Sequence, residues 1–302
     1  PPVWEVSMLT VCQNALRFLG AASCLALWMT VPAIAWAQSE VASIPTASVH
    51  PVLNPDAPDF TFGCEMDPDG VHAWITVSGQ VAFSPVGNYN NRLLKVDTQT
   101  RGIVSQVLVD LFPEDIEIIT GAGGAATRLY VACNGSSTIG AVDPVTMSVI
   151  AVVNLGLCFG TYSQFPFELA ASTDQSKLFV GTSGCDNVFV IDIDPSSPGY
   201  HAASTLATYT GGHGAVATAP GYAQKVFVGS SVYFGIFGGS YASLDVIDYS
   251  TATPTVTSTP IGAAIAGDFA SINGILPLSG GRALLVENSQ SRAHLFLIDL
   301  AT

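Results

Sequence analysis

Residues 128–150, RLYVACNGSSTIGAVDPVTMSVI, decide the fold of this chain. They contain an apolar stretch, a Gly/Ser turn, a second apolar stretch that ends at Asp143, and a third stretch rich in β-branched residues. Apolar and β-branched runs separated by Gly, Ser, Asn and Pro are typical of strands joined by tight turns. The stretch therefore predicts three strands in succession.

The same order of features returns along the chain. Its clearest mark is an apolar strand that ends in Asp, and successive marks are 46 to 56 residues apart. An Asp at the end of a strand accepts hydrogen bonds from the amides that follow it, so these residues are predicted to form turns and not to catalyse a reaction. The marks are Asp97 with Thr100, Asp143 with Thr146, Asp192 with Pro195, Asp248 with Thr251, and Asp299 with Thr302.

Two further strands precede each mark. The nearer one is a three-residue apolar marker, and a short strand before it is clearest at 167–172 and 215–218. No helical periodicity lies between the strands, and continuous apolar runs such as 149–153 indicate sheets covered on both faces. Four-stranded units at this spacing predict an all-β chain, a β-propeller with five blades; a solenoid or sandwich is the alternative. The markers are Ala73-Trp74-Ile75, Leu129-Tyr130-Val131, Leu178-Phe179-Val180, Val226-Phe227-Val228 and Leu284-Leu285-Val286.

The units resemble the β-propeller repeat family named for its Tyr-Val-Thr-Asn signature. Tyr130-Val131-Ala132-Cys133 matches the first half of that signature, Asp67-Pro68-Asp69-Gly70 matches its Ser-Pro-Asp-Gly turn, and residues 212–217 match its Pro-His-Gly-Ile-Ala-Val segment. The resemblance covers about residues 60 to 302. It implies a propeller fold, in a family that includes lactonase-like enzymes, quinoprotein-like dehydrogenase subunits and surface-layer proteins.

The fifth unit stops at its turn residue, Thr302, before an outermost strand. The favoured interpretation is a truncated copy of a larger propeller of about seven blades. The alternative is that a segment near 49–53 crosses over and closes a ring of five blades.

The first 59 residues divide into three expected parts. Residues 1–7 are interpreted as upstream read-through, 8–37 as a signal peptide with one basic residue, an apolar run and small residues at Ala35 and Ala37, and 38–59 as a linker. Residues 60–302 form the propeller repeats. A cleaved leader predicts a periplasmic or secreted protein without stable membrane insertion; an uncleaved anchor is the alternative.

Charge limits the partners. The chain has nine Lys and Arg against 23 Asp and Glu, a net charge of −14, which opposes phosphate backbones and anionic lipid. We therefore expect no nucleic-acid partner.

Four cysteines follow the expected leader: Cys64, Cys133, Cys158 and Cys185. An even number in an exported chain predicts two disulfides, with free buried thiols as the alternative. The repeat alignment places all four near one end of the blades and favours the pairs Cys158–Cys185 and Cys64–Cys133.

That end carries the loops that join the second strand of each unit to the third (the b–c loops) and the connections between blades. It is the expected binding face for a small molecule or a protein. Aromatic residues gather there in a connection with Phe159, Tyr162 and Phe165 and in an expected long loop after Ser231. Such residues can form a binding platform, although packing of the loops onto the ring explains them equally well. The candidate binding residues are Asp115, Phe165, Glu168, His213, Tyr233, Phe234 and Asn273.

The motifs do not specify a catalytic residue, a metal site or a cofactor. No Gly-x-Ser-x-Gly or Cys-x-x-Cys-His occurs, and the glycines at 121–124 precede a strand where a phosphate loop would open a helix. We therefore expect a non-catalytic scaffold that binds a ligand or a protein. The alternative is an exported enzyme, a lactonase-like hydrolase or quinoprotein-like oxidoreductase, that uses Asp115, Glu168 and His213 at the axial rim.

Overall fold

A computed structural model describes residues 60–78, 91–160, 162–209, 211, 214–233, 240–261, 270–289 and 293–300. The expected read-through, signal peptide and linker at 1–59 lie outside these residues. Within them, no helix is long and apolar enough to cross a bilayer.

Consecutive antiparallel strands pair to form the first two sheets, which have four strands each. The first contains β1 (Phe60–Met66), β2 (His72–Ser78), β3 (Arg92–Asp97) and β4 (Gly102–Leu108). The second contains β5 (Pro113–Thr120), β6 (Ala126–Cys133), β7 (Thr138–Asp143) and β8 (Ser148–Asn154). A single 3-10 turn, η1 (Asn134–Ser136), joins β6 to β7.

The second half of the described chain repeats this order. The third sheet contains β11 (Pro166–Ala171), β12 (Lys177–Thr182), β13 (Asn187–Asp192) and β14 (Ala203–Thr208). The fourth contains β15 (Ala215–Ala217), β16 (Lys225–Tyr233), β17 (Ser240–Asp248) and β18 (Thr255–Ile261). The fifth has three strands among the described residues, β19 (Ala270–Leu278), β20 (Arg282–Ser289) and β21 (Ala293–Asp299), and a two-stranded ribbon is formed by β9 (Leu157–Cys158) and β10 (Tyr162–Ser163).

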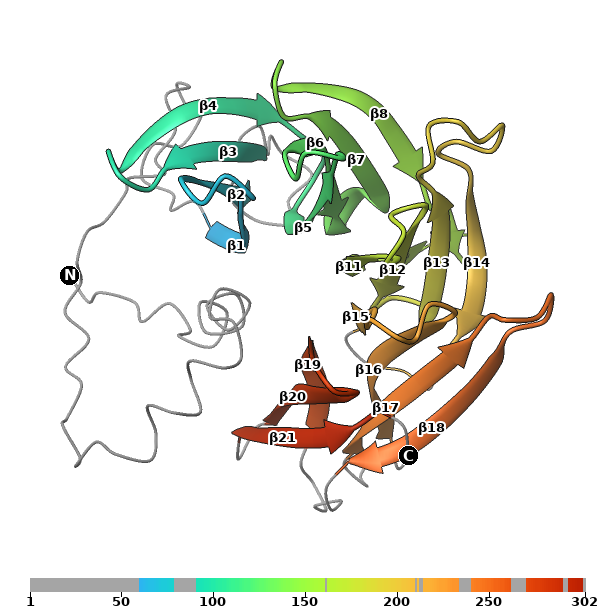
Figure 1. The fold of residues 1–302 in the computed structure, drawn as a ribbon. Coiled ribbons are helices and arrows are strands. Elements are labelled where there is room, and N and C mark those ends of the chain that lie inside the picture. The colour runs from blue at the N-terminus through green and yellow to red at the C-terminus, as the bar shows by residue number, and fades with distance from the viewer. Residues whose placement is uncertain are drawn as a thin grey trace, which may run out of the picture.

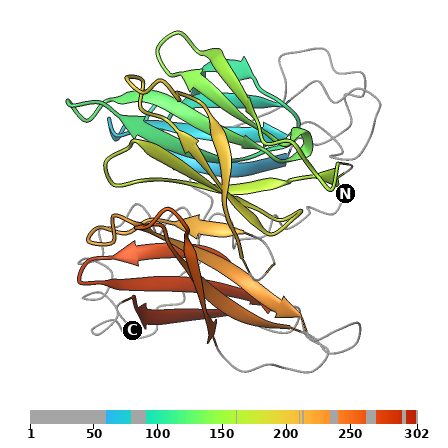
Figure 2. The same ribbon diagram turned by 90° about the vertical axis from the view of Figure 1, so that its right-hand side faces the viewer.

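The five sheets stand side by side around a common centre (Figure 1). The first strand of each sheet (β1, β5, β11, β15 and β19) lies innermost, and later strands lie progressively farther out. A view from the side shows the sheets stacked face to face (Figure 2). The predicted all-β architecture of four-stranded units is confirmed, and the described sheets form an open arc in which the first and fifth sheets stand apart.

The marker strands of the three middle sheets, in β6, β12 and β16, each pack against the sheets on both of their sides. In β6, Tyr130 shares a core with Leu169 of the third sheet, whereas its neighbour Val131 shares a core with Trp74 of the first. Successive side chains of a strand point to opposite faces, so an apolar run without alternation supplies two cores at once. This explains why the marker strands contain no polar position.

The turns that follow the Asp marks form as predicted. Asp97 Oδ1 accepts hydrogen bonds of 2.8 Å from the amides of Gln99 and Thr100, and Asp143 Oδ1 accepts bonds of 2.8 and 2.9 Å from the amides of Val145 and Thr146. These bonds to the ionised carboxylates lower the pKa of both groups. The carboxylates of these two marks therefore serve the turns.

Neighbouring sheets come closest where a second strand meets the innermost strand of the next sheet. A Cβ added to Gly181 of β12 would collide with the Gly214 carbonyl oxygen and lie 2.8 Å from Val216 Cγ1. A Cβ on Gly229 of β16 would lie 2.6 Å from the Ile272 carbonyl oxygen. Glycine is therefore required at both positions because the backbone of the next sheet occupies the space of a side chain.

Replacing Gly181 with Ala should separate the third and fourth sheets. We expect Gly181→Ala to lower the free energy of unfolding by roughly 1–3 kcal/mol, since the methyl group overpacks a backbone contact. Gly140→Ala is the matched control, because Gly140 is also buried in a strand but nothing lies within 4 Å of an added Cβ. Denaturant unfolding of both variants measures the difference, and equal stabilities would contradict the close approach.

Candidate functional site

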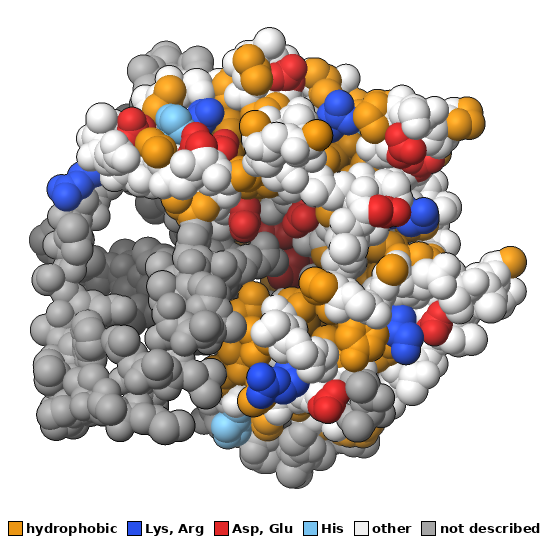
Figure 3. Space-filling view, in the orientation of Figure 1, with side chains coloured by type: hydrophobic (Ala, Val, Ile, Leu, Met, Phe, Trp, Pro, Cys, Tyr) orange, Lys and Arg blue, Asp and Glu red, His pale blue; other side chains and the backbone are white. Residues whose placement is uncertain are grey.

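Carboxylates of the innermost strands join one sheet to the next. Asp115 Oδ2 on β5 accepts a hydrogen bond of 2.8 Å from the Leu169 amide on β11, and Glu168 Oε2 on β11 accepts one of 3.2 Å from the Val216 amide on β15. Glu117 Oε1 accepts a bond of 3.2 Å from the Ala171 amide. Acidic side chains are visible at the central hollow in Figure 3. Two predicted rim residues, Asp115 and Glu168, thus lie on neighbouring strands, but each is an acceptor for the adjacent sheet.

Glu114 adds a carboxyl group that sequence reasoning did not select. It lies beside Asp115 in an irregular part of β5, where the register with β6 shifts between Pro113 and Ile116. Its Oε2 atom is buried without a hydrogen-bond partner among the described residues. Burial, reinforced by the Asp115 charge, raises the pKa of Glu114 to about 8, so the carboxyl group is protonated at neutral pH.

Two further candidate residues have local contacts of their own. Phe165 precedes β11 with a left-handed backbone, and its ring packs where a Cβ on Gly184 would lie. Asn273 lies in β19 and accepts a hydrogen bond of 2.5 Å from Ser271 Oγ. His213 and Phe234 lie outside the described residues, and for Tyr233 only the backbone is described.

The prediction that a long loop starts directly after Ser231 is wrong. β16 continues to Tyr233 and β17 begins at Ser240, and the two strands pair from Ser231↔Ala242 to Tyr233↔Ser240. The insertion therefore lengthens two paired strands, because backbone groups that continue the ladder satisfy each other's hydrogen bonds.

The cysteines follow one expected pairing and depart from the other. Cys158 of β9 and Cys185 of the β12–β13 loop form a disulfide, with Cα atoms 5.9 Å apart. The pair Cys64–Cys133 is wrong: both are free thiols. The buried Cys133 side chain packs in the core between the first two sheets, and its Sγ lies 3.7 Å from the Val131 carbonyl oxygen of its own strand. Burial raises the pKa of Cys133 to about 12 and that of Cys64 to about 11, which keeps both thiols protonated and weakly nucleophilic.

The disulfide fixes an exposed apolar hairpin on the loop face, which we define as the end of the sheets that carries the b–c loops and the inter-sheet connections. The hairpin is the β9–β10 ribbon, and its Leu157, Phe159 and Tyr162 are 56%, 92% and 64% exposed. At its base Ser137 Oγ lies 2.6 Å from Ser163 Oγ. The aromatic connection that the sequence singled out is thus a braced surface element, in which Phe159 and Tyr162 are exposed whereas Phe165 packs against Gly184.

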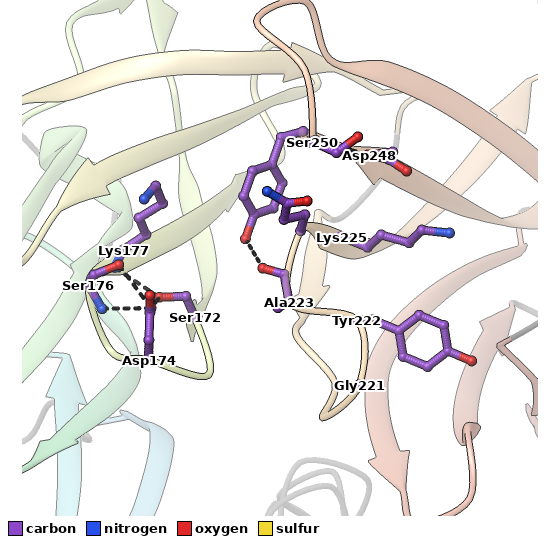
Figure 4. Close-up of a pocket in the computed structure, with 12 residues that line it drawn as sticks. Ser172, Asp174, Ser176, Lys177, Gly221, Tyr222, Ala223, Lys225, Asp248 and Ser250 are labelled. Atoms are coloured by element: carbon purple, nitrogen blue, oxygen red, sulfur yellow. Dashed lines mark hydrogen bonds between the residues drawn. The ribbon is translucent and has the colours of Figure 1, made fainter.

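A groove lies at the opposite end of the sheets, which we call the turn face. It has a volume of about 650 Å³ and is formed by turns of the third and fourth sheets (Figure 4). Sequence reasoning missed it, since its walls are turns at 172–177, 221–225 and 248–250 that are far apart along the chain. The signal that could have found it is the lysine distribution: two of the three lysines in the chain, Lys177 and Lys225, line this groove.

A metal site does not emerge in the described part of the chain, where no group of three or more His, Cys, Asp and Glu side chains is arranged to hold an ion. The chemistry available at the innermost strands is that of a neutral carboxyl group on Glu114 beside the carboxylate of Asp115.

Comparisons with known proteins support the fold alone. No family model and no curated protein matches the chain. Among solved structures, the periplasmic gluconolactonase PpgL of Pseudomonas aeruginosa aligns with a TM-score of 0.55 at 13% identity, covering 80% of this chain and 69% of that one. Hydrazine synthase of Kuenenia stuttgartiensis aligns at 0.52 and 18%, covering 76% and 74%, and the β-propeller domain of Myceliophteria thermophila Cps50 (Swd1) at 0.51 and 14%, covering 79% and 65%. The chain therefore has a propeller-like fold.

Glu114 should make stability depend on pH in a defined direction. Its pKa is about 8 in the folded chain and near 4.5 when unfolded, so the unfolded state ionises first and stability falls as pH rises from about 4.5 to about 8. We expect Glu114→Gln to remove a penalty on the order of 4–5 kcal/mol at pH 8.5 and to change little at pH 4.

Urea unfolding at the two pH values measures this effect. Asp174→Asn is the control without pH dependence in this range: hydrogen bonds from Ser172 and Ser176 lower the pKa of Asp174 to about 2, so its stabilising contribution is present at both pH values and its loss should be nearly equal at each. A Glu114→Gln variant that is equally stabilised at both pH values would contradict the assignment.

Proposed function

We propose that this chain is an exported propeller scaffold that binds a protein partner through its loop face and catalyses no reaction. The main observation in support of this proposal is the hairpin that the disulfide holds in place. Three apolar side chains stand exposed on a ribbon held by a disulfide, and aromatic anchors on rigid supports contribute strongly to protein interfaces because little conformational entropy is lost on binding.

The state of the rim acids supports a scaffold without chemistry. Asp115 and Glu168 accept backbone hydrogen bonds from the neighbouring sheet, so both carboxylates have a structural role at the positions where the enzyme alternative would place its catalytic residues. Removing either acceptor would leave an amide unsatisfied between two sheets.

Export is supported by the disulfide between Cys158 and Cys185, since such bonds persist mainly in oxidising compartments. The signal-like segment at 8–37 is consistent with it. Membership of the Tyr-Val-Thr-Asn repeat family is part of the same proposal and rests on the motifs in phase along the chain.

The second candidate is an exported hydrolase or oxidoreductase, and one observation favours it. Glu114 and Asp115 form a pair in which Glu114 is protonated and Asp115 is ionised. Enzymes that use one carboxyl group as an acid and another as a base have such pairs. The two functions predict different effects when the rim carboxylates are replaced by amides of the same shape.

Under the scaffold proposal, amide variants should behave like the unmutated chain. Asp115→Asn and Glu168→Gln keep an oxygen that accepts the neighbouring amide, whereas Asp115→Ala and Glu168→Ala should each lose roughly 1–3 kcal/mol of unfolding free energy. Unfolding curves and assays of sugar-lactone hydrolysis and dye-linked alcohol oxidation are run on all four. Turnover above the buffer rate that Asp115→Asn abolishes at unchanged stability would establish the enzyme instead.

The hairpin can be tested separately. Phe159→Ser combined with Tyr162→Ser should leave the unfolding free energy within about 0.5 kcal/mol, because exposed side chains contribute little to folding. Crosslinking to a partner from a photoreactive residue at position 157 should be lost in this variant. Val145→Ser is the control, since Val145 is 86% exposed on the turn face. Equal crosslinking in the double variant and the control would exclude the hairpin as the binding surface.

A further inference from the structure

The groove on the turn face is a preformed cavity between two sheets. Its first wall is the β11–β12 turn, and its second consists of the β15–β16 turn and the start of the β17–β18 turn (Figure 4). A volume of about 650 Å³ is within the range of small-molecule sites, which is about 300–1,000 Å³.

Hydrogen bonds hold the first wall in shape. Asp174 Oδ1 accepts bonds from Ser172 Oγ at 2.6 Å and from Ser176 Oγ at 2.9 Å, and the Lys177 amide donates to Ser172 Oγ at 2.9 Å. The turn therefore positions Asp174 and Lys177 before any ligand arrives.

The second wall is held equally well. The Tyr249 hydroxyl donates a bond of 2.7 Å to the Ala223 carbonyl oxygen, and the Tyr249 ring lies 5.3 Å from that of Phe179 in the third sheet. Tyr249 thus ties the two turns of this wall together and closes the floor against the neighbouring sheet.

Each wall carries one cation and one anion that are not used in ion pairs. Among the described residues, the ammonium groups of Lys177 and Lys225 form no salt bridge; Lys225 lies 5.9 Å from the centre of the Tyr222 ring. Asp248 accepts a hydrogen bond of 2.9 Å from the Ser250 amide, and the Ser250 side chain, this amide and the Lys225 charge lower the pKa of its carboxyl group. The groove is balanced in charge on a chain of net charge −14.

This balance restricts the ligand. A simple anion would face the two carboxylates and the acidic remainder of the chain, and a simple cation would face two lysines. A molecule with one charge of each sign at its two ends satisfies both walls and gains charge-assisted hydrogen bonds at each.

We propose that the groove binds a small zwitterion, a short peptide with free termini, whose carboxylate pairs with Lys177 and whose ammonium group pairs with Asp248 on the facing wall. An extended tripeptide spans about 10 Å, since each residue adds about 3.3–3.6 Å. This site lies at the opposite end of the sheets from the hairpin, so its failure would leave the proposed function untouched.

Isothermal titration with triglycine tests the site, with acetyl-triglycine and triglycine amide as probes that lack one charge each. We expect both capped probes to bind about tenfold more weakly than triglycine, since each loses a hydrogen bond between charged groups. In Lys177→Met, triglycine and its amide should bind equally; in Asp248→Asn, triglycine and its acetyl form should bind equally. Lys95→Met is the control, because Lys95 lies over Trp74 in the first sheet and should leave all three affinities unchanged.

The unmutated chain provides an independent measurement. Reductive methylation followed by mass spectrometry should show that triglycine slows modification of Lys177 but not of Lys95. No binding of triglycine at about 10 mM would overturn the proposal, as would equal affinities for the three probes or equal protection of the two lysines.

Discussion

The contact between the innermost strand of one sheet and the adjacent sheet is the constraint on which the rest of the structure depends. Side chains cannot fill this space, because the carbonyl groups of Gly214 and Ile272 approach Gly181 and Gly229 too closely for a Cβ. Backbone amides that point into it need acceptors, and Asp115 and Glu168 supply them. Acidic residues near the centre therefore follow from packing whether or not a ligand binds there.

The same constraint divides the molecule into a central region and two ends that are free to vary. At the loop face, the Cys158–Cys185 disulfide ties an exposed apolar hairpin to the third sheet. At the turn face, short turns whose carboxylates accept hydrogen bonds within the turn form a charge-balanced groove between the third and fourth sheets. Rigid sheets with variable ends allow two separate surfaces on one scaffold, since loops change without disturbing the cores between the sheets.

Local features of the sequence predicted local structure well. Asp97 and Asp143 form the expected turns because their hydrogen bonds reach amides only two and three residues away. Tyr130 and Val131 pack on opposite sheets because strand geometry alone sends them there. The predictions failed where the partner is distant in sequence: Cys133 remains a thiol in a core, and the groove is formed by turns that meet only in three dimensions.

By itself, the sequence determined the all-β class, the four-stranded unit and its spacing, and the end of the sheets at which each loop emerges. These properties depend on periodicity and turn chemistry, which act over a few residues. Tertiary structure decided which carboxylates accept hydrogen bonds from a neighbouring sheet, which cysteines pair, and where opposite charges face each other across a groove. Those outcomes depend on distances between sheets, and such distances are set by the packing of backbones and side chains that are far apart along the chain.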